Sequence, residues 1–290
     1  MTTLDVLARE NGTFAMVAMD QRESLRTMLA QHHPSPISDD RLVAFKLAVA
    51  RELAPFASGF LIDRDYGFAE VVAQGLLPAT SGLILAVDVL DQPPGGVVED
   101  TDVEEQVEPG PAVALKLLVI WRDDGERARR VETSRRFVEL AERRDVLSVL
   151  EGVVRDAPDR EAAIVEAARE LSAVGPSLYK CEVPLHGRGD PAEIERRAQE
   201  IDAVLDCPWV VLSQGVEPDD YPRAVEAACR GGASGFLAGR ALWTSTLAAE
   251  DPTELLRRHS VPRLRELGAI VDAHGRPWRE KRDKRDKEAR

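Results

Sequence analysis

The sequence predicts a (β/α)8 TIM barrel, an α/β fold in which eight parallel strands alternate with helices. First, eight short apolar segments alternate with amphipathic stretches over roughly 240 residues, the size of such a barrel. Second, these segments are continuously apolar, as expected for parallel strands that are buried on both faces. Third, no GxGxxG motif follows an early strand, which disfavours the competing doubly wound sheet.

Each apolar segment is expected to form one strand of the barrel. In chain order the segments are Phe14–Asp20, Gly59–Asp63, Gly82–Asp88, Val113–Ile120, Val146–Glu151, Ser177–Glu182, Trp209–Ser213 and Gly235–Gly239. Amphipathic periodicity predicts helices between them, among them Asp39–Leu53, Glu126–Arg143, Arg160–Leu171, Pro191–Leu205 and Asp219–Cys229. Residues 91–111, rich in Pro, Gly and acidic residues, interrupt this rhythm and are expected to form a loop near the third strand.

The chain is expected to hold one barrel domain over residues 1–275. Its last part, after Glu250, predicts extra C-terminal helices that pack outside the barrel. Residues 276–290 are dominated by charges of both signs, and we expect this tail to fray.

The composition limits the partners and the compartment. The chain of 290 residues carries 38 basic and 51 acidic residues, a net charge of −13, which disfavours binding to nucleic acid or to an anionic membrane. Its three cysteines lie far from any CxxC spacing, so neither a disulfide framework nor a zinc site is indicated. With no signal-peptide pattern and no long apolar run, a cytoplasmic protein is expected. We expect it to use no metal or other cofactor.

Charged residues lie at or near the ends of the predicted strands, where barrel enzymes place their sites. Lys116 and Lys180 each lie inside an apolar strand, and a buried charge is costly unless it is paired or used. Two lysines in one barrel would lower each other's pKa, so that one could attack a ketone and form a Schiff base. The alternative is that each lysine is a structural ion-pair partner, for example Lys180 with Glu151 or Asp20.

The carboxylates allow a catalytic and a structural interpretation. Glu151 closes its predicted strand and is followed by Gly152, which leaves room beside a general acid or base. Alternatively it only neutralises the lysines. Asp20 could hydrogen-bond a substrate hydroxyl or cap the following helix. We expect Asp63 and Asp88 to be structural.

Two glycine-containing loops predict an anion site after the last two strands. Ser213 and Gly215 follow the seventh strand, and Gly239 with Arg240 follows the eighth and begins a helix. The alternative is that these are simply tight turns. A second anionic group could be bound by a set of polar side chains near other strand ends: Gln21, Arg22, His186 and Arg188. Trp121, Trp209 and Trp243 are expected to pack between strands and helices.

Several segments together resemble a known family. These are AMDQRESLR, ALKLLVIWR, SLYKCEVPLHGRG, PWVVLSQGV, GASGFLAGRALW and SVPRLRELGAIVD. They are similar to the sulfofructosephosphate aldolases and their relatives, the class I tagatose-1,6-bisphosphate aldolases. This resemblance implies a metal-independent Schiff-base aldolase, a homo-oligomer, in which Lys180 forms the imine, Glu151 is the acid/base and Lys116 is the second lysine. It also places the family's aspartate on Asp20 and its anion-binding residues on Ser213, Gly215, Gly239 and Arg240.

The resemblance implies cleavage of 6-deoxy-6-sulfofructose 1-phosphate to dihydroxyacetone phosphate and 3-sulfolactaldehyde. A sulfonate needs less positive charge than a second phosphate. The loop with His186 and Arg188 offers one arginine and a mostly neutral histidine, which favours the sulfonate. Gln214 stands where a small residue is expected, the segment DRDYG resembles the tagatose branch as much as the sulfo-sugar branch, and His186 and Arg188 replace other side chains. Two alternatives stay open: a tagatose or fructose 1,6-bisphosphate aldolase, and a catalytically silent sugar-phosphate sensor.

Overall fold

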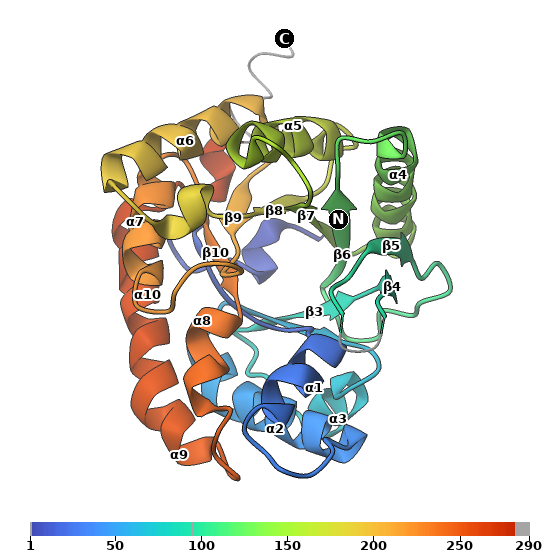
Figure 1. The fold of residues 1–290 in the computed structure, drawn as a ribbon, viewed down its shortest axis with the longest axis vertical. Helices are drawn as coiled ribbons and strands as arrows, with labels where there is room; N and C mark the ends of the chain where they lie inside the picture. The colour runs from blue at the N-terminus through green and yellow to red at the C-terminus, as the bar shows by residue number, and fades with distance from the viewer. Residues whose placement is uncertain (1, 94–95, 282–290) are drawn as a thin grey trace.

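The computed structural model describes residues 2–93 and 96–281, and it contains the predicted closed barrel of eight parallel strands (Figure 1). Its strands are β1 (Phe14–Met19), β2 (Gly59–Asp63), β3 (Gly82–Ala86), β6 (Ala114–Trp121), β7 (Leu147–Val154), β8 (Leu178–Cys181), β9 (Trp209–Val211) and β10 (Gly235–Ala238). The order around the barrel follows the chain, and β10 pairs with β1 to close it. The predicted fold is therefore confirmed.

Helices surround most of the barrel. They are α1 (Glu23–Ala30), α2 (Asp39–Leu53), α3 (Phe68–Ala73), α4 (Arg127–Arg143), α5 (Arg160–Ser172), α6 (Pro191–Val204) and α7 (Tyr221–Arg230), followed by α8 (Arg240–Trp243), α9 (Thr253–Leu255) and α10 (Val261–His274). Ser38, Asp159 and Asp190 cap α2, α5 and α6 by accepting a hydrogen bond from a first-turn N–H. The predicted C-terminal helices are present as α9 and α10.

The excursion at residues 91–111 is more ordered than predicted. β4 (Asp88–Asp91) and β5 (Asp100–Val103) pair in antiparallel fashion, and this hairpin follows β3 directly. Arg129 and Arg136 of α4 form ion pairs with Asp100 and Asp102 of β5. The described residues between β3 and β6 form no helix, and the hairpin and the loop after it pack there instead.

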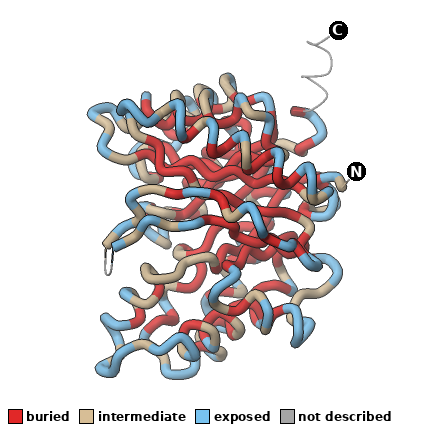
Figure 2. Tube along the Cα trace, turned by 90° about the vertical axis from the view of Figure 1, so that its right-hand side faces the viewer, coloured by how far each residue is buried: buried red, intermediate tan, exposed pale blue. Residues whose placement is uncertain are grey.

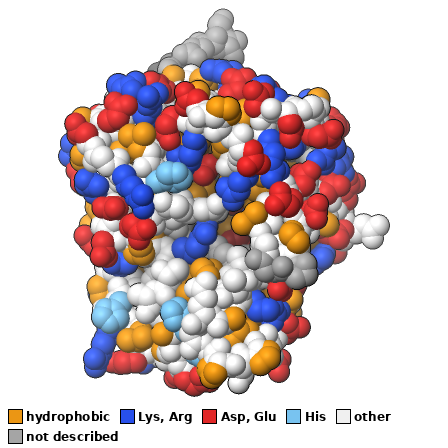
Figure 3. Space-filling view, in the orientation of Figure 1, with side chains coloured by type: hydrophobic (Ala, Val, Ile, Leu, Met, Phe, Trp, Pro, Cys, Tyr) orange, Lys and Arg blue, Asp and Glu red, His pale blue; other side chains and the backbone are white. Residues whose placement is uncertain are grey.

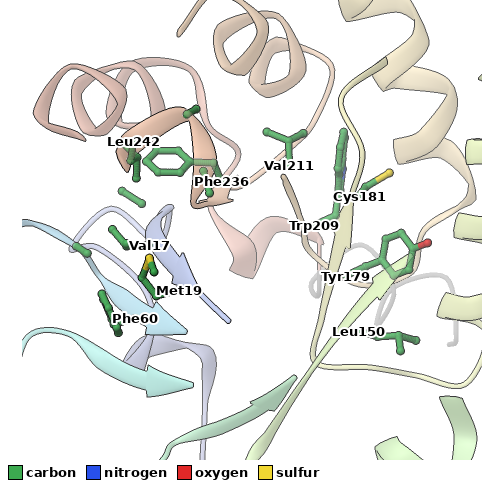
Figure 4. Packing of buried hydrophobic residues seen from close by; sticks show 14 of the residues in the cluster. Val17, Met19, Phe60, Leu150, Tyr179, Cys181, Trp209, Val211, Phe236 and Leu242 are labelled. Atoms are coloured by element: carbon green, nitrogen blue, oxygen red, sulfur yellow. The ribbon is translucent and has the colours of Figure 1, made fainter. Parts of the chain in front are cut away.

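Apolar side chains fill two layers, as the alternation along each strand requires. One set, which includes Met16, Leu61 and Leu237, fills the barrel interior. The larger set lies between strands and helices, and Figure 4 shows Tyr179, Trp209 and Phe236 within it. Buried segments accordingly run through the middle of the molecule in Figure 2.

The tail begins later than predicted. Arg276 contacts the carboxylate of Asp202 at 2.8 Å, Trp278 is 5% exposed within the interior apolar set, and the Lys281 ammonium contacts Asp202 at 3.0 Å. Residues 276–281 are therefore packed rather than frayed, because these three side chains find partners on the barrel. The rest of the predicted tail, residues 282–290, lies outside the described residues.

The charged surface is mixed. On the face seen in Figure 3, acidic and basic side chains are interspersed and do not form one basic patch. No helix of the described chain is long and apolar enough to cross a membrane.

Candidate active site

A cavity of about 190 Å³ lies at the C-terminal ends of the barrel strands. The polar and charged residues that line it are Asp20, Gln21, Arg22, Ser24, Asp88, Gln92, Lys116, Glu151, Arg155, Lys180, Ser213, Gln214 and Arg240. An apolar part of its wall is formed by Leu118, Ile120, Val153 and Leu212, with Val98 from the hairpin. The cavity therefore lies where a barrel enzyme places its active site.

Glu151 joins two lysines at the floor of this cavity. Its Oε1 lies 3.0 Å from Lys180 Nζ, and its Oε2 lies 2.8 Å from Lys116 Nζ. Glu151 of β7 is in register with Lys180 of β8, so both side chains reach the interior at the same level. All three residues are buried, with exposed fractions of 1% to 7%. The ion pair between Lys180 and Glu151, one of the two interpretations of the sequence, is thus present, and it is compatible with catalysis.

Lys116 is surrounded by carboxylates. Its Nζ lies 2.8 Å from Asp20, 3.4 Å from Asp88 and 2.8 Å from Glu151. Burial alone would lower the pKa of Lys116, but these three carboxylates raise it well above its ordinary value. The expectation that the two lysines lower each other's pKa is therefore wrong for Lys116, which stays a cation.

The carboxylates divide into two kinds. Burial alone would raise the pKa of Asp20 and of Glu151, but Lys116 and Lys180 hold both below their ordinary values. Burial outweighs the attraction of Lys116 at Asp88 and raises the pKa of that carboxyl. Asp20 and Glu151 are therefore ionised in the resting site, so Glu151 is present as the carboxylate.

Three of the four predicted anion-binding residues line the cavity. They are Ser213, Gly239 and Arg240, and the Arg240 guanidinium donates a hydrogen bond to Gln214 Oε1 at 2.7 Å. Gly239 approaches β1 so closely that a Cβ there would lie 2.4 Å from the Ala18 carbonyl oxygen, so the position requires glycine. Burial lowers the pKa of Arg240.

Gly215 does not line the cavity, contrary to prediction. Its φ of +76° turns the chain, and a Cβ there would lie 2.6 Å from the His186 ring. This glycine is therefore needed for the turn and for packing against the histidine.

Two of the four residues predicted for the second anionic group also lie elsewhere. Gln21 and Arg22 line the cavity, whereas His186 and Arg188 do not. The loop carrying His186 folds back with left-handed backbone at Leu185, His186, Gly187 and Gly189. Arg188 is exposed and pairs with Glu217 at 3.4 Å. These two side chains do not reach the cavity as the prediction required, because the sequence did not reveal this backbone conformation.

Two charged residues of the cavity, Arg155 and Asp88, were not predicted to be part of the site. Arg155 was overlooked because the strand was predicted to end at Glu151, whereas β7 continues to Val154. The alternation Glu151, Val153, Arg155 would have placed all three on the inner face. Asp88 was expected to be only structural, but it lines the cavity and pairs with Lys116.

Asp63 lies outside the cavity, and it is buried against Lys46 of α2. Trp121, Trp209 and Trp243 are at most 2% exposed within the apolar layer between strands and helices, which confirms their predicted packing role.

The barrel and its cavity define an enzyme class once they are compared with known proteins. Residues 14–245 match the model of the DeoC/LacD family aldolases. The chain therefore belongs to the DeoC/LacD aldolase family and is a carbon–carbon lyase. Among its relatives is tagatose 1,6-diphosphate aldolase 2 of Streptococcus pyogenes serotype M1, which is 27% identical over 93% of this chain and 94% of its own length.

Another relative is tagatose 1,6-diphosphate aldolase 1 of Streptococcus mutans serotype c, 26% identical over 96% of this chain and 97% of its own length. Solved structures share the fold. A fructose-bisphosphate aldolase from Slackia heliotrinireducens aligns with a TM-score of 0.64 at 14% identity, over 93% of this chain and 88% of that one. An archaeal fructose-1,6-bisphosphate aldolase, whose catalytic Lys carries a carbinolamine intermediate, aligns with a TM-score of 0.58 at 18% identity, over 92% and 97%.

Proposed function

We propose that the protein is a Schiff-base aldolase that cleaves a ketohexose 1-phosphate, with Lys180 as the nucleophile. The observation that carries this proposal is the single carboxylate, Glu151, between the ammonium groups of Lys180 and Lys116. Lys116 has three carboxylate partners and stays charged, whereas the ion pair formed by Lys180 in the cavity is with Glu151 alone. Lys180 is thus the lysine that can transfer a proton to Glu151 and attack.

The reaction begins when Glu151 accepts a proton from Lys180, whose free amine then adds to the C2 carbonyl carbon. The carbinolamine loses its hydroxyl as water with a proton from Glu151, which leaves a protonated imine. Glu151, again a carboxylate, takes the proton from the C4 hydroxyl. The C3–C4 bond then breaks, its electron pair moves into the imine as an enamine, and the fragment from C4 to C6 leaves as the aldehyde. Protonation at C3 and hydrolysis then release dihydroxyacetone phosphate and restore Lys180.

The other charged groups stabilise this sequence. Lys116 is a fixed cation 2.8 Å from Asp20, where it can donate to substrate oxygens as charge develops on them. Asp20 lies at the end of β1 and accepts a hydrogen bond from a substrate hydroxyl. The phosphate lies near Ser213, Gly239 and Arg240, where one guanidinium and the backbone after β10 meet.

The group at C6 of the proposed substrate is the sulfonate of 6-deoxy-6-sulfofructose 1-phosphate, near Gln21 and Arg22. Five cationic and three anionic side chains line the cavity, an excess of two positive charges. A phosphate with a sulfonate brings about −3, and a bisphosphate brings about −4. The charge of the sulfo-sugar phosphate is therefore closer in size to the excess positive charge of the cavity than the charge of a bisphosphate is. The sequence motifs quoted above also support the sulfo-sugar, although the argument from His186 and Arg188 no longer applies.

The competing substrates are tagatose and fructose 1,6-bisphosphate, which the names of the relatives favour. A panel of the three sugars, with coupled detection of dihydroxyacetone phosphate, decides between them. We expect the highest kcat/KM for the sulfo-sugar and a loss with all three in Arg240→Ala. Equal or better turnover of a bisphosphate would replace the sulfo-sugar. Binding without release of dihydroxyacetone phosphate from any of them would favour the silent sensor.

A further inference from the structure

A second buried ion pair lies directly behind the cavity wall. Lys46 of α2 and Asp63, the last residue of β2, form a hydrogen-bonded ion pair, and both side chains are fully buried. Desolvation makes such a pair costly, and well-packed apolar side chains of similar volume often serve stability as well or better. Stability alone therefore does not explain why these two charges are here.

The pair is connected to Arg22, which lines the cavity. Asp63 Oδ1 accepts hydrogen bonds from the backbone N–H of Asp65 at 3.1 Å and of Tyr66 at 2.8 Å, so its position is fixed. Arg22 Nε lies 3.8 Å from this oxygen and 3.4 Å from the Asp65 carboxylate. On its other edge, Arg22 donates from Nη1 to the Asp88 carbonyl oxygen at 3.0 Å.

Arg22 is held between these groups without being fully satisfied by them. Its Nε is buried and donates no hydrogen bond within the described residues, and its side chain is 12% exposed, toward the cavity. The Nε edge faces the carboxylates of Asp63 and Asp65, while the guanidinium as a whole lines the cavity, and a cation held in this way is suited to an anionic ligand.

We propose that Lys46 and Asp63 are positioning residues that hold Arg22 in the cavity, where it binds the anion on the aldehyde half of the substrate. This inference rests on the proposed aldolase function. Lys46 occupies Asp63 Oδ2 and thereby limits the attraction of Asp63 for Arg22. Without Lys46, the whole charge of Asp63 acts on Arg22 and draws its guanidinium away from the ligand.

The test measures aldehyde selectivity in the condensation direction. Dihydroxyacetone phosphate is offered with an anionic aldehyde, 3-sulfolactaldehyde or glyceraldehyde 3-phosphate, and separately with neutral glyceraldehyde. In Arg22→Gln the ratio of kcat/KM for the anionic over the neutral aldehyde should fall about tenfold or more, the effect of one charge-assisted hydrogen bond. Lys46→Met should lower the same ratio. Combining Lys46→Met with Arg22→Gln should lower the ratio no further than Arg22→Gln alone, because both changes act through Arg22.

A variant without either buried charge separates positioning from folding. Lys46→Met combined with Asp63→Asn removes the attraction for Arg22, so its selectivity should recover relative to Lys46→Met. A purely structural ion pair would also make Lys46→Met less stable than the variant without both charges, but it predicts the same selectivity ratio for wild type, Lys46→Met and Lys46→Met/Asp63→Asn once each is folded. Arg257→Met is the control. It breaks an ion pair with Glu52, which lies on α2 like Lys46, but neither residue of this pair lines the cavity. The ratio of kcat/KM for the anionic over the neutral aldehyde should therefore stay unchanged.

The failure of this inference and the failure of the proposed function give different results. If wild-type protein condenses neither aldehyde with dihydroxyacetone phosphate, the aldolase proposal fails before any variant is made. If the wild type prefers the anionic aldehyde and Arg22→Gln abolishes this preference, but Lys46→Met retains it, the positioning role is overturned. An unchanged ratio in Arg22→Gln would overturn it as well.

Discussion

At the residue scale, the site depends on how charges are paired beneath the cavity. Lys116, Lys180 and Glu151 could be predicted from sequence, because a charged side chain inside an apolar strand needs a partner or a use. The number of carboxylates around each lysine could not be predicted, since it depends on strands that are far apart in the chain. That number is what distinguishes Lys116 from Lys180.

Glu151→Gln keeps the shape of the side chain but removes the base between the two lysines. We expect kcat to fall about 10²–10⁴-fold, the usual contribution of general acid–base catalysis, with little change in KM. Steady-state kinetics with the preferred substrate measure both constants. A kcat near that of the wild type, together with lower stability, would assign Glu151 a structural role instead.

Lys116→Met leaves three buried carboxylates without their shared cation. At about pH 7 we expect the free energy of unfolding to fall by about 3–5 kcal/mol, the cost of breaking a buried ion pair. The lowered pKa values of Asp20 and Glu151 mean that each carboxylate stabilises the fold above about pH 4, and this contribution is lost as the pH falls.

Burial raises the pKa values of Asp20 and Glu151, and Lys116 is the largest of the effects that lower them. Removing Lys116 should therefore make the free energy of unfolding depend less steeply on pH in the acidic range. The deficit of Lys116→Met in urea unfolding should therefore shrink as the pH approaches about 4, because protonation removes the unpaired charges. If Lys116→Met lost as much unfolding free energy at about pH 4 as at about pH 7, the result would contradict the assignment of Lys116 as the shared cation of these carboxylates.

At the scale of elements, the apolar segments predicted every strand of the barrel, but not where each ends. β7 extends to Val154, past Glu151, and so Arg155 reaches the cavity. The hairpin of β4 and β5 was missed because its strands are short and acidic, and they pair with each other and with arginines of α4 rather than through an apolar face. The left-handed turn near His186 begins on two residues without a glycine's freedom, Leu185 and His186, so the glycine that follows at Gly187 signals a turn but not where it starts.

Gly152 of β7 leaves space for the side chain of Tyr179 of β8. The room expected beside Glu151 is occupied by Tyr179, since a Cβ at Gly152 would lie 2.1 Å from the Tyr179 hydroxyl oxygen. Gly152→Ala should lower the free energy of unfolding by about 1–3 kcal/mol through overpacking. Tyr179→Phe removes the clashing oxygen, and the double variant should regain part of the loss in urea unfolding. No recovery would mean that the backbone, not this hydroxyl, limits the position.

At the scale of the whole molecule, stability and chemistry lie at opposite ends of the barrel. The cavity lies at the C-terminal ends of the strands, whereas the segment after α10 packs near the chain's N-terminal residues: Trp278 N–H donates to the Gly12 carbonyl oxygen. The sequence predicted the barrel because eight apolar segments alternate with amphipathic helical stretches along the chain. It did not predict the packing of residues 276–281, because most residues of this segment are charged and only one of them, Trp278, is a large buried apolar residue.

Trp278→Ala should therefore destabilise the protein without changing its chemistry. We expect a loss of about 3–5 kcal/mol in the free energy of unfolding, as for other buried aromatic residues, with kcat unchanged at a temperature where the variant is folded. Trp278→Phe, which retains most of the apolar contact, is the control and should lose less. A large drop in kcat of folded Trp278→Ala would show that this end of the barrel is coupled to the site.

The central claim is that Lys180 forms the covalent bond to the substrate ketone. Borohydride added with dihydroxyacetone phosphate should reduce the imine and leave a stable adduct, which mass spectrometry of proteolytic peptides can place. We expect the adduct on the peptide that contains Lys180, its absence in Lys180→Met, and full activity in the presence of chelators. An adduct on Lys116, or activity lost with EDTA and restored by zinc, would contradict the mechanism.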